Sequence, residues 1–470
     1  MNYHKIFLII CAAFILIAGM PFSKKAYPIT VKQEEEMSHE FMKVVLKHIR
    51  LIDDHFIVNY VNRIGKKVIS IMPPQPFSYH FYVIKEDTFN AFASPAGHIF
   101  INSGLFEAME SEEELAGIIS HEIAHVVCRH ISKKIERSKK IGIATMAGIA
   151  AGIFLGSGGA ATAGNTLILG SMAAGQSVAL AYSREEEMQA DQIGLEYLKK
   201  AGYGAEGLLT VLKKIRSKQW FDSNQIPTYL RTHPAVDDRI AYIGTWLENN
   251  PIAPGKINPY DFQLAHTKLF AMYGDESLTL KKLETKISNR PVSPMSYYGY
   301  GLILARTGYY KEAVIYLKNA LEKKAFDPNI LIDLGRIYFL AGKYQDALNS
   351  LEAAVSLAPD DPGGLFFLGR TQMELEKFNE AASSFEELLR KYPNYTQAYY
   401  FLAKAYNSQG RKTEIHYLLG IYYKKRGELK NAVIHLERAL KNAKDSEKER
   451  KIKEMIKEVR KKMKKSRKGG

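Results

Sequence analysis

Cysteine is nearly absent from this chain of 470 residues, which contains only Cys11 and Cys128. Cys11 lies in an apolar run at the N-terminus, so a processed protein would keep one thiol and form no internal disulfide. Long apolar runs are missing after that first one, which argues against a protein that crosses a membrane several times. No nucleic-acid recognition motif accompanies the net charge of +15, and we expect no nucleic-acid partner.

The N-terminal apolar run has the pattern of an export signal. His4 and Lys5 precede a mostly apolar stretch from Ile6 to Met20, which is shorter than the roughly 20 residues of a membrane-spanning helix. We predict that residues 1–25 are a signal peptide or, because no clear cleavage site follows, an uncleaved N-terminal anchor. Either alternative exports the rest of the chain.

Charge is distributed unevenly along the sequence. Residues 441–470 hold 14 Lys/Arg and 5 Asp/Glu, which predicts a solvated basic tail or a contact with an anionic membrane surface. In contrast, residues 141–183 contain nine glycines and no Asp, Glu, Lys, Arg or His. The apolar part of this segment is too short to cross a bilayer, so we expect two buried helices or a mobile lid in preference to a transmembrane hairpin.

The most informative stretch is His121-Glu122-Ile123-Ala124-His125. On a helix, positions i and i+4 lie one turn apart on one face, so the two imidazoles can bind one metal ion and Glu122 can act as a general base on its water. The segment before it starts with Ser111 and acidic residues, and apolar residues then follow at helical spacing. The motif therefore lies on a partly buried helix.

A zinc site of this kind needs a third protein ligand and an open fourth position. Glu187 and Asp191 are again four residues apart, so Glu187 can complete the set while Asp191 orients a ligand imidazole. Cys128 lies about one turn after His125, and geometry alone does not exclude its thiolate as a ligand. We interpret Cys128 as a core cysteine.

Short strands and helical repeats surround this motif. His80–Ile84, Phe89–Ala93 and His98–Ile101 predict three strands, and we assign Asn90–Ala93 to a sheet edge that binds an extended substrate peptide; the alternative is an ordinary core strand. Later in the chain, Gly301, Gly335 and Gly369 are 34 residues apart, and an alanine follows each glycine by 12 residues. This period is typical of tetratricopeptide repeats.

The repeat pattern also sets the predicted domains. Gly420 breaks the period, because it follows Ala403 by only 17 residues, so one helix of a repeat is missing there or a helix has been inserted. We predict a metallopeptidase domain at residues 26–255 and helical repeats at 256–445. Residues 446–470 should form a basic C-terminal helix or tail that caps the repeats.

A series of short motifs follows one another along the chain: Asn90-Ala91-Phe92-Ala93, Gly97-His98-Ile99, Gly104-Leu105, His121 to His125, Ser183-Arg184 with Glu187, Ala190-Asp191, Thr232-His233-Pro234 and Arg239. Their order resembles that of HtpX-like and CAAX-protease-like zinc metallopeptidases, and most of all the BepA/YfgC type, in which an exported peptidase is joined to tetratricopeptide repeats. One departure is Gln189, where an acidic residue is common.

The resemblance implies a fold and a set of site residues. The fold class is an α+β zincin-like metallopeptidase domain, mostly helical with a small sheet, followed by an all-α repeat solenoid. The resemblance selects Glu187, in place of Cys128, as the third ligand of one Zn²⁺ per chain beside His121 and His125. Glu122 is then the catalytic base, and His233 and Arg239 become candidates for stabilising the oxyanion.

These features predict an exported zinc endopeptidase of misfolded or misassembled outer-membrane proteins. The compartment is the periplasm of a Gram-negative-type bacterium, either free or in contact with a membrane. The repeats would recruit clients or assembly machinery in the groove between their first helices. The alternative is a non-proteolytic periplasmic chaperone or assembly scaffold that acts through its repeats.

Overall fold

The structure is a computed structural model, and it describes residues 29–137, 181–221, 227–251, 257–289, 291–443 and 445–468. The predicted signal segment and nearly all of the uncharged segment 141–183 lie outside these ranges. The chain divides into two compact units. The first contains residues up to 51, 64–105 and 113–255, and the second contains 52–63, 106–112 and 256–470. The second unit thus consists mainly of residues after 255, and two earlier segments pack with the repeats.

The first unit contains a three-stranded sheet in the order β1-β3-β2, formed by β1 (His80–Ile84), β3 (His98–Asn102) and β2 (Ala91–Ser94). Strands β1 and β3 are parallel, whereas β2 and β3 are antiparallel and pair Phe92 with Phe100. Ala96 and Gly97 make the tight connection with positive φ angles of 62° and 87°. All three predicted strands are present, and β2 is an edge of the sheet in the described part of the chain.

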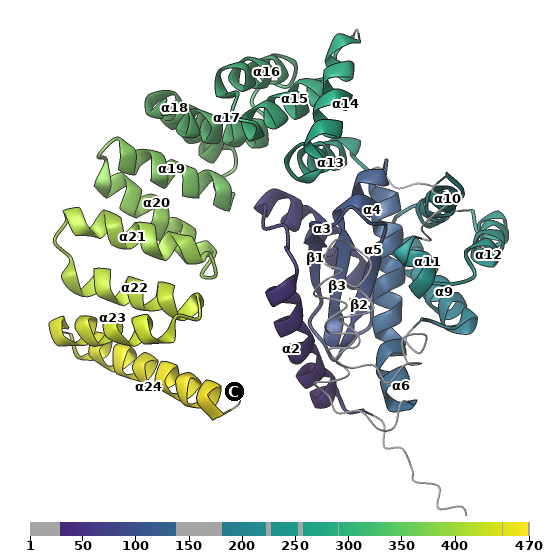
Figure 1. The fold of residues 1–470 in the computed structure, drawn as a ribbon, viewed down its shortest axis with the longest axis horizontal. Coiled ribbons are helices and arrows are strands. Elements are labelled where there is room, and N and C mark those ends of the chain that lie inside the picture. The colour runs from purple at the N-terminus through teal and green to yellow at the C-terminus, as the bar shows by residue number, and fades with distance from the viewer. Residues whose placement is uncertain are drawn as a thin grey trace, which may run out of the picture. The chain divides into compact units, whose positions relative to one another are not determined.

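Helices surround this sheet (Figure 1). Helix α2 (Val31–His48) begins at a capping box of Thr30 and Gln33, and its Phe41 packs against Phe92 and Phe100. The remaining helices of the first unit and its junctions are α3 (His55–Ile69), α4 (Ser103–Ala108), α5 (Glu112–Val127), α6 (His130–Arg137), α9 (Arg184–Lys200), α10 (Glu206–Phe221), α11 (Thr228–Thr232) and α12 (Val236–Asn249).

The second unit is built mainly from consecutive helices that pack as antiparallel pairs (Figure 1). They are α13 (Pro259–Tyr273), α14 (Glu276–Ser288), α15 (Pro294–Arg306), α16 (Tyr310–Lys323), α17 (Pro328–Leu340), α18 (Tyr344–Leu357), α19 (Pro362–Glu374), α20 (Phe378–Lys391), α21 (Thr396–Ser408), α22 (Lys412–Lys425), α23 (Leu429–Asn442) and α24 (Ser446–Lys468).

The repeated glycines lie where paired helices approach each other most closely. A Cβ atom at Gly335 would lie 2.5 Å from Leu351 Cγ on the next helix, and one at Gly369 would lie 2.8 Å from the Phe385 ring. Gly420 of α22 meets Leu436 of α23 in the same way, although α22 directly follows α21. The irregular spacing therefore reflects one helix, α21, without a pairing partner of its own between the α19/α20 and α22/α23 pairs.

The described residues contain no helix that combines the length and the apolar character needed to cross a membrane.

Candidate active site

Helix α5 places His121, Glu122 and His125 in the interior of the first unit, with at most 1% of each side chain exposed. Helix α9 packs tightly against α5 at Gly194. A Cβ atom at this position would lie only 3.4 Å from the backbone of His121. The hydroxyl of Ser120 also donates a hydrogen bond of 2.8 Å to the carbonyl of Gly194. A glycine at this crossing therefore brings α9 within ligand distance of the α5 imidazoles.

Glu187 faces the two imidazoles from the first turns of α9, which begins at a capping box formed by Ser183 and Glu186. His121 Nε2 and His125 Nε2 lie 3.0 Å apart, and the carboxylate oxygens of Glu187 lie 3.5 Å and 3.4 Å from them. Atoms that share a tetrahedral zinc ion at about 2.0–2.1 Å are separated by about 3.3 Å. The three side chains thus have the spacing that one zinc ion requires.

His233 completes the group from the C-terminal end of α11. One ligand atom each from His121, His125, Glu187 and His233 lies within 4.8 Å of the others. His233 Nδ1 lies 3.3 Å from the carbonyl oxygen of Tyr229, so Nε2 points into the group and lies 3.5 Å from Glu122 Oε1. The sequence therefore predicted the presence of His233 in the site, and the structure places it within reach of the metal position.

The donor set fits zinc. Three imidazoles and a carboxylate are the ligand types that Zn²⁺ takes in proteins, and catalytic zinc sites use three of them and keep one position open. Both carboxylate oxygens of Glu122 and Nε2 of His233 are buried and make no hydrogen bond within the described ranges. Buried polar groups are normally hydrogen-bonded, so these atoms indicate a missing metal ion, its water or a substrate.

Arg239 holds the acidic side of the site in place. Its Nε and Nη2 atoms donate to the two oxygens of Asp191 at 2.7 Å each, and Nη1 lies 2.6 Å from Glu187 Oε2. Asp191 Oδ1 lies 2.9 Å from His121 Nδ1 and fixes the tautomer in which Nε2 is free to bind a metal. Asp191 thus lies where the sequence placed it, whereas Arg239 is committed to carboxylates.

Burial keeps the two imidazoles in the neutral form that binds a metal, whereas it raises the pKa of Glu187 well above its ordinary value. Burial lowers the pKa of His121 to about 4, with a further contribution from Arg239, and burial lowers that of His125 well below its ordinary value. Burial raises the pKa of Glu122 to about 8. Burial opposes the charge of Asp191, but Arg239 and His121 overcome it and lower its pKa to about 2. Neutral imidazoles are the form that binds zinc.

Two further layers of the site were not anticipated. His125 Nδ1 lies 2.8 Å from His130 Nδ1, and His130 Nε2 lies 3.0 Å from Gln189 Oε1. Gln189, the departure from the common pattern, thus supports a ligand through His130. Tyr182 stacks on His125 with ring centroids 3.7 Å apart, and its buried hydroxyl makes no hydrogen bond to the described residues. No spacing in the sequence relates these residues to the motif on α5.

The predicted substrate strand lies beside Glu122. Asn90, Ala91, Phe92 and Ala93 are buried, and the main chain of Ala93 is close enough to Glu122 to lower the pKa of its carboxyl against the effect of burial. Cys128 is a free, buried cysteine outside the ligand group, which agrees with its interpretation as a core residue.

Comparisons with known proteins agree with this geometry. Residues 58–247 match Peptidase family M48, and residues 368–414 and 413–446 match the tetratricopeptide repeat. The predicted fold class is confirmed: a mostly helical domain that matches Peptidase family M48 and contains a small sheet precedes helical repeats. The family is zinc-dependent, so the predicted cofactor is confirmed as well.

Several proteins of known name are similar in sequence to part of this chain. It is 27% identical over 291 residues to the beta-barrel assembly-enhancing protease of Yersinia pestis, covering 61% of this chain and 59% of the relative. It is 29% identical to the putative beta-barrel assembly-enhancing protease of Vibrio cholerae, covering 58% and 57%. The mitochondrial metalloendopeptidase OMA1 of Schizosaccharomyces pombe is 26% identical and covers 47% of this chain and 62% of that protein. The match thus spans less than two thirds of each relative.

Proposed function

We propose that this chain is an exported zinc endopeptidase that cuts misfolded or misassembled proteins of the cell envelope, in particular of the outer membrane. The observation that carries this proposal is the buried ligand set of His121, His125 and Glu187 beside the buried carboxylate of Glu122, which lies 3.5 Å from His233 Nε2. A structural zinc site has no need of a buried carboxylate without hydrogen bonds. The names of the bacterial relatives support beta-barrel proteins as the client class.

The chemistry follows from the positions of the side chains. When bound, zinc supplies Lewis-acid polarisation of the scissile carbonyl and makes its water more acidic. Glu122 accepts a proton from the attacking water and passes it to the leaving amine. An extended client segment would pair with the edge of β2, which holds the scissile bond beside Glu122.

His233 and Arg239 take different roles in this proposal. His233 Nε2 points into the site and can donate to the oxyanion, whereas Arg239 positions Glu187 and Asp191 through direct ion pairs. If His233 instead served as a permanent fourth ligand, it would close the coordination position that a catalytic site keeps open. A His233→Ala variant that keeps its zinc and loses cleavage supports the donor role, and loss of zinc supports the ligand role.

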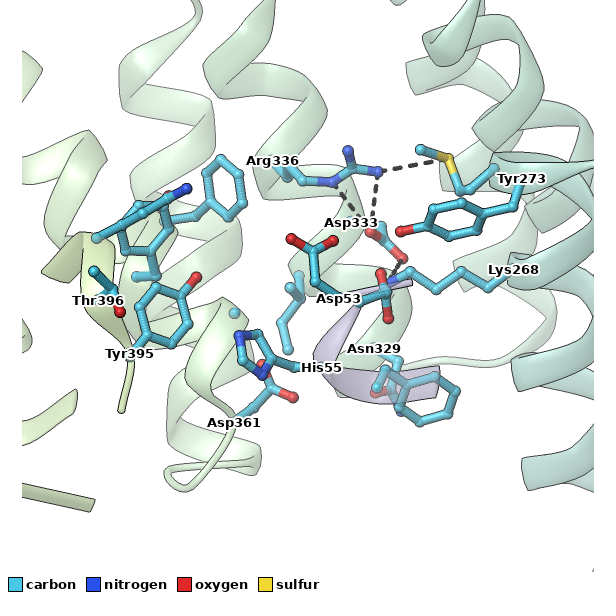
Figure 2. A pocket seen from close by; sticks show the side chains of 18 of the residues that line it. Asp53, His55, Lys268, Tyr273, Asn329, Asp333, Arg336, Asp361, Tyr395 and Thr396 are labelled. Atoms are coloured by element: carbon cyan, nitrogen blue, oxygen red, sulfur yellow. Dashed lines mark hydrogen bonds and ion pairs between the residues drawn. The ribbon is translucent and has the colours of Figure 1, made fainter. Parts of the chain in front are cut away.

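The repeats supply the site that we assign to a partner protein or client. A cavity of about 520 Å³ within the second unit is lined by residues 53–56 and by the first helices of successive repeats, including Asn329 and Arg336 of α17 and Thr396 of α21 (Figure 2). Lys268 lies 3.1 Å from Asp333, which also pairs with Arg336 at 3.2 Å. Paired charges beside aromatic rings suit a polypeptide with both polar and apolar side chains.

The metal set has a direct test. A Glu187→Gln variant should lose most of its zinc, measured as metal per chain after dialysis. Cys128→Ala is the matched control, because its thiol is outside the ligand group, and it should keep wild-type zinc. A Glu187→Gln variant with full zinc would contradict the assignment.

The proposed activity is separated from the non-proteolytic alternative by casein cleavage. The purified full-length chain should degrade casein, and a chelator should abolish this activity until zinc is added back. A chain that never cleaves casein but prevents its aggregation would favour the chaperone or scaffold, for which the repeat cavity is the supporting observation. Export to the periplasm is tested separately by cell fractionation.

A further inference from the structure

The last helix, α24, has one face that is fixed to the repeats. Ile452, Ile456 and Val459 are buried, at most 6% exposed, in a cluster with residues of α23. Two ion pairs also join α24 to the neighbouring helix α22. Lys448 of α24 lies 2.6 Å from Glu414 of α22, and Glu458 of α24 lies 2.6 Å from Lys424 of α22. The described part of α24 is therefore a fixed element of the second unit, and the groups on its other face are held in a defined arrangement.

That other face carries a row of cations. Lys457, Lys461 and Lys464 are spaced i, i+4 and i+7, so they lie on one side of the helix over about 10 Å. All three are exposed, and none pairs with an acidic group in the part of the chain that the structure describes. Other basic residues nearby are already neutralised, since Arg460 pairs with Glu437 at 2.6 Å. The row is thus a concentrated positive charge without counter-ions.

An apolar groove lies directly beside this row. It runs between α23 and α24, with the side chains of Leu440 and Ile456 among those of Lys453, Lys457, Arg460, Lys461 and Lys464 and of one acidic residue, Glu437, which pairs with Arg460. An apolar floor with a cationic rim matches a ligand that is anionic at one end and hydrocarbon at the other. A soluble acidic polymer would satisfy only the charges.

We propose that this face of α24 is a docking surface for membranes that contain anionic phospholipid. The exposed lysines lie against the headgroups, and the groove beside Leu440 accepts part of an acyl chain or glycerol backbone. The proposal is independent of the peptidase activity, because every residue that it uses lies in α23 and α24. It gives the chain a fixed orientation at a lipid surface.

Vesicle co-sedimentation tests the proposal with the full-length chain. The protein should bind vesicles of 70% phosphatidylcholine and 30% phosphatidylglycerol and should not bind pure phosphatidylcholine. One cation near an anionic surface contributes about fivefold in affinity, so Lys457→Gln/Lys461→Gln/Lys464→Gln should weaken binding about 100-fold. The corresponding triple arginine variant should bind as the wild type does, because it keeps the charge.

A matched control separates local from net charge. Lys311→Gln/Lys323→Gln/Lys343→Gln removes the same charge from exposed positions on α16 and its neighbourhood, and it should change vesicle binding by less than about twofold. Leu440→Asn should weaken vesicle binding and leave binding to soluble dextran sulfate unchanged. Equal vesicle binding by both glutamine variants would overturn the proposal. So would tighter binding to dextran sulfate than to vesicles, which would assign the surface to an acidic macromolecule.

Discussion

At the scale of single residues, the site depends on which nitrogen and oxygen atoms already form hydrogen bonds or ion pairs within the protein. Arg239 makes three polar contacts of 2.6 to 2.7 Å with Asp191 and Glu187. A guanidinium can make these contacts together because its donors lie in a rigid planar fork. The metal position is therefore defined by residues that would not themselves touch the ion.

Replacement of Arg239 by lysine tests this positioning role. Arg239→Lys keeps the charge but cannot hold both carboxylates, so zinc affinity should fall about 10- to 100-fold, as is usual when outer-shell partners of a metal site are removed. Competition with a zinc-binding dye measures the affinity. Arg216→Lys is the control, since Arg216 pairs with Asp237 at an exposed site and should not affect zinc. Equal zinc affinities for the two variants would contradict the role of Arg239.

Helical periodicity could place His121, Glu122 and His125 on one helix face and Glu187 with Asp191 on another, and the family resemblance selected Glu187 over Cys128 as the third ligand. The sequence could not predict that Asp191 is the partner of Arg239. These residues are 48 positions apart in the sequence, and their contact depends on how helices α9 and α12 pack. The roles of His130 and Tyr182 were missed for the same reason. A lone histidine or tyrosine carries no periodic signal, and only the packing of α5, α6 and α9 shows what it contacts.

A buried ion pair in the repeat unit predicts a dependence of stability on pH. Burial opposes the charge of Asp333, but Lys268 and Arg336 overcome it and lower its pKa. Because the pKa is lower in the folded state, the ionised carboxylate contributes its full stabilisation above the ordinary aspartate pKa near 4. This contribution to the free energy of unfolding is lost as the pH falls further. Asp333→Asn should therefore cost about 3 kcal/mol at pH 7. The difference from wild type should shrink in urea unfolding below pH 3, and a constant difference would contradict this account.

At the scale of secondary-structure elements, the repeated glycines set how closely helices pair. A Cβ at Gly335 would overlap Leu351 at 2.5 Å, so Gly335→Ala should destabilise the repeats by about 1–3 kcal/mol. Gly244 is also helical but has no neighbour within 4 Å, and Gly244→Ala should be neutral or stabilising. Thermal unfolding followed by circular dichroism distinguishes the two. Equal effects would show that the close approach does not determine stability.

The elements also show where sequence patterns were sufficient. The 34-residue spacing predicted the helix pairs, and the break at Gly420 predicted that a helix is missing or inserted there, because both follow from periodicity. The strands were predicted from β-branched and aromatic residues, but the pairing order β1-β3-β2 was not. Strand order depends on contacts between distant residues, which one sequence does not contain.

At the scale of the whole molecule, the two units do not follow the order of the sequence. Residues 52–63 and 106–112 pack with the repeats, where Phe106 is fully buried and contacts Phe262 of α13. Lys268 likewise lies 3.2 Å from Asp54. A peptidase cannot therefore be cut from this chain at residue 255 without removing the partners of two of its segments.

This arrangement predicts that the repeats are needed for a stable peptidase. A fragment of residues 29–255 should unfold at lower urea concentration than the same region in the full chain, since Ile57 and Phe106 would lose their apolar surroundings. Limited proteolysis should cut this fragment faster. If the fragment resists urea and protease as well as the full-length chain does, the two segments contribute nothing to its stability.

Glu122 is expected to carry out chemistry at a zinc site that it does not itself build. The direct measurement is zinc content and casein cleavage for Glu122→Gln in the full-length chain. The account predicts one zinc per chain, as in the wild type, together with a rate lowered by about 10²–10⁴ or more. Cleavage above about a tenth of the wild-type rate, with zinc retained, would contradict the role of Glu122 as the general base.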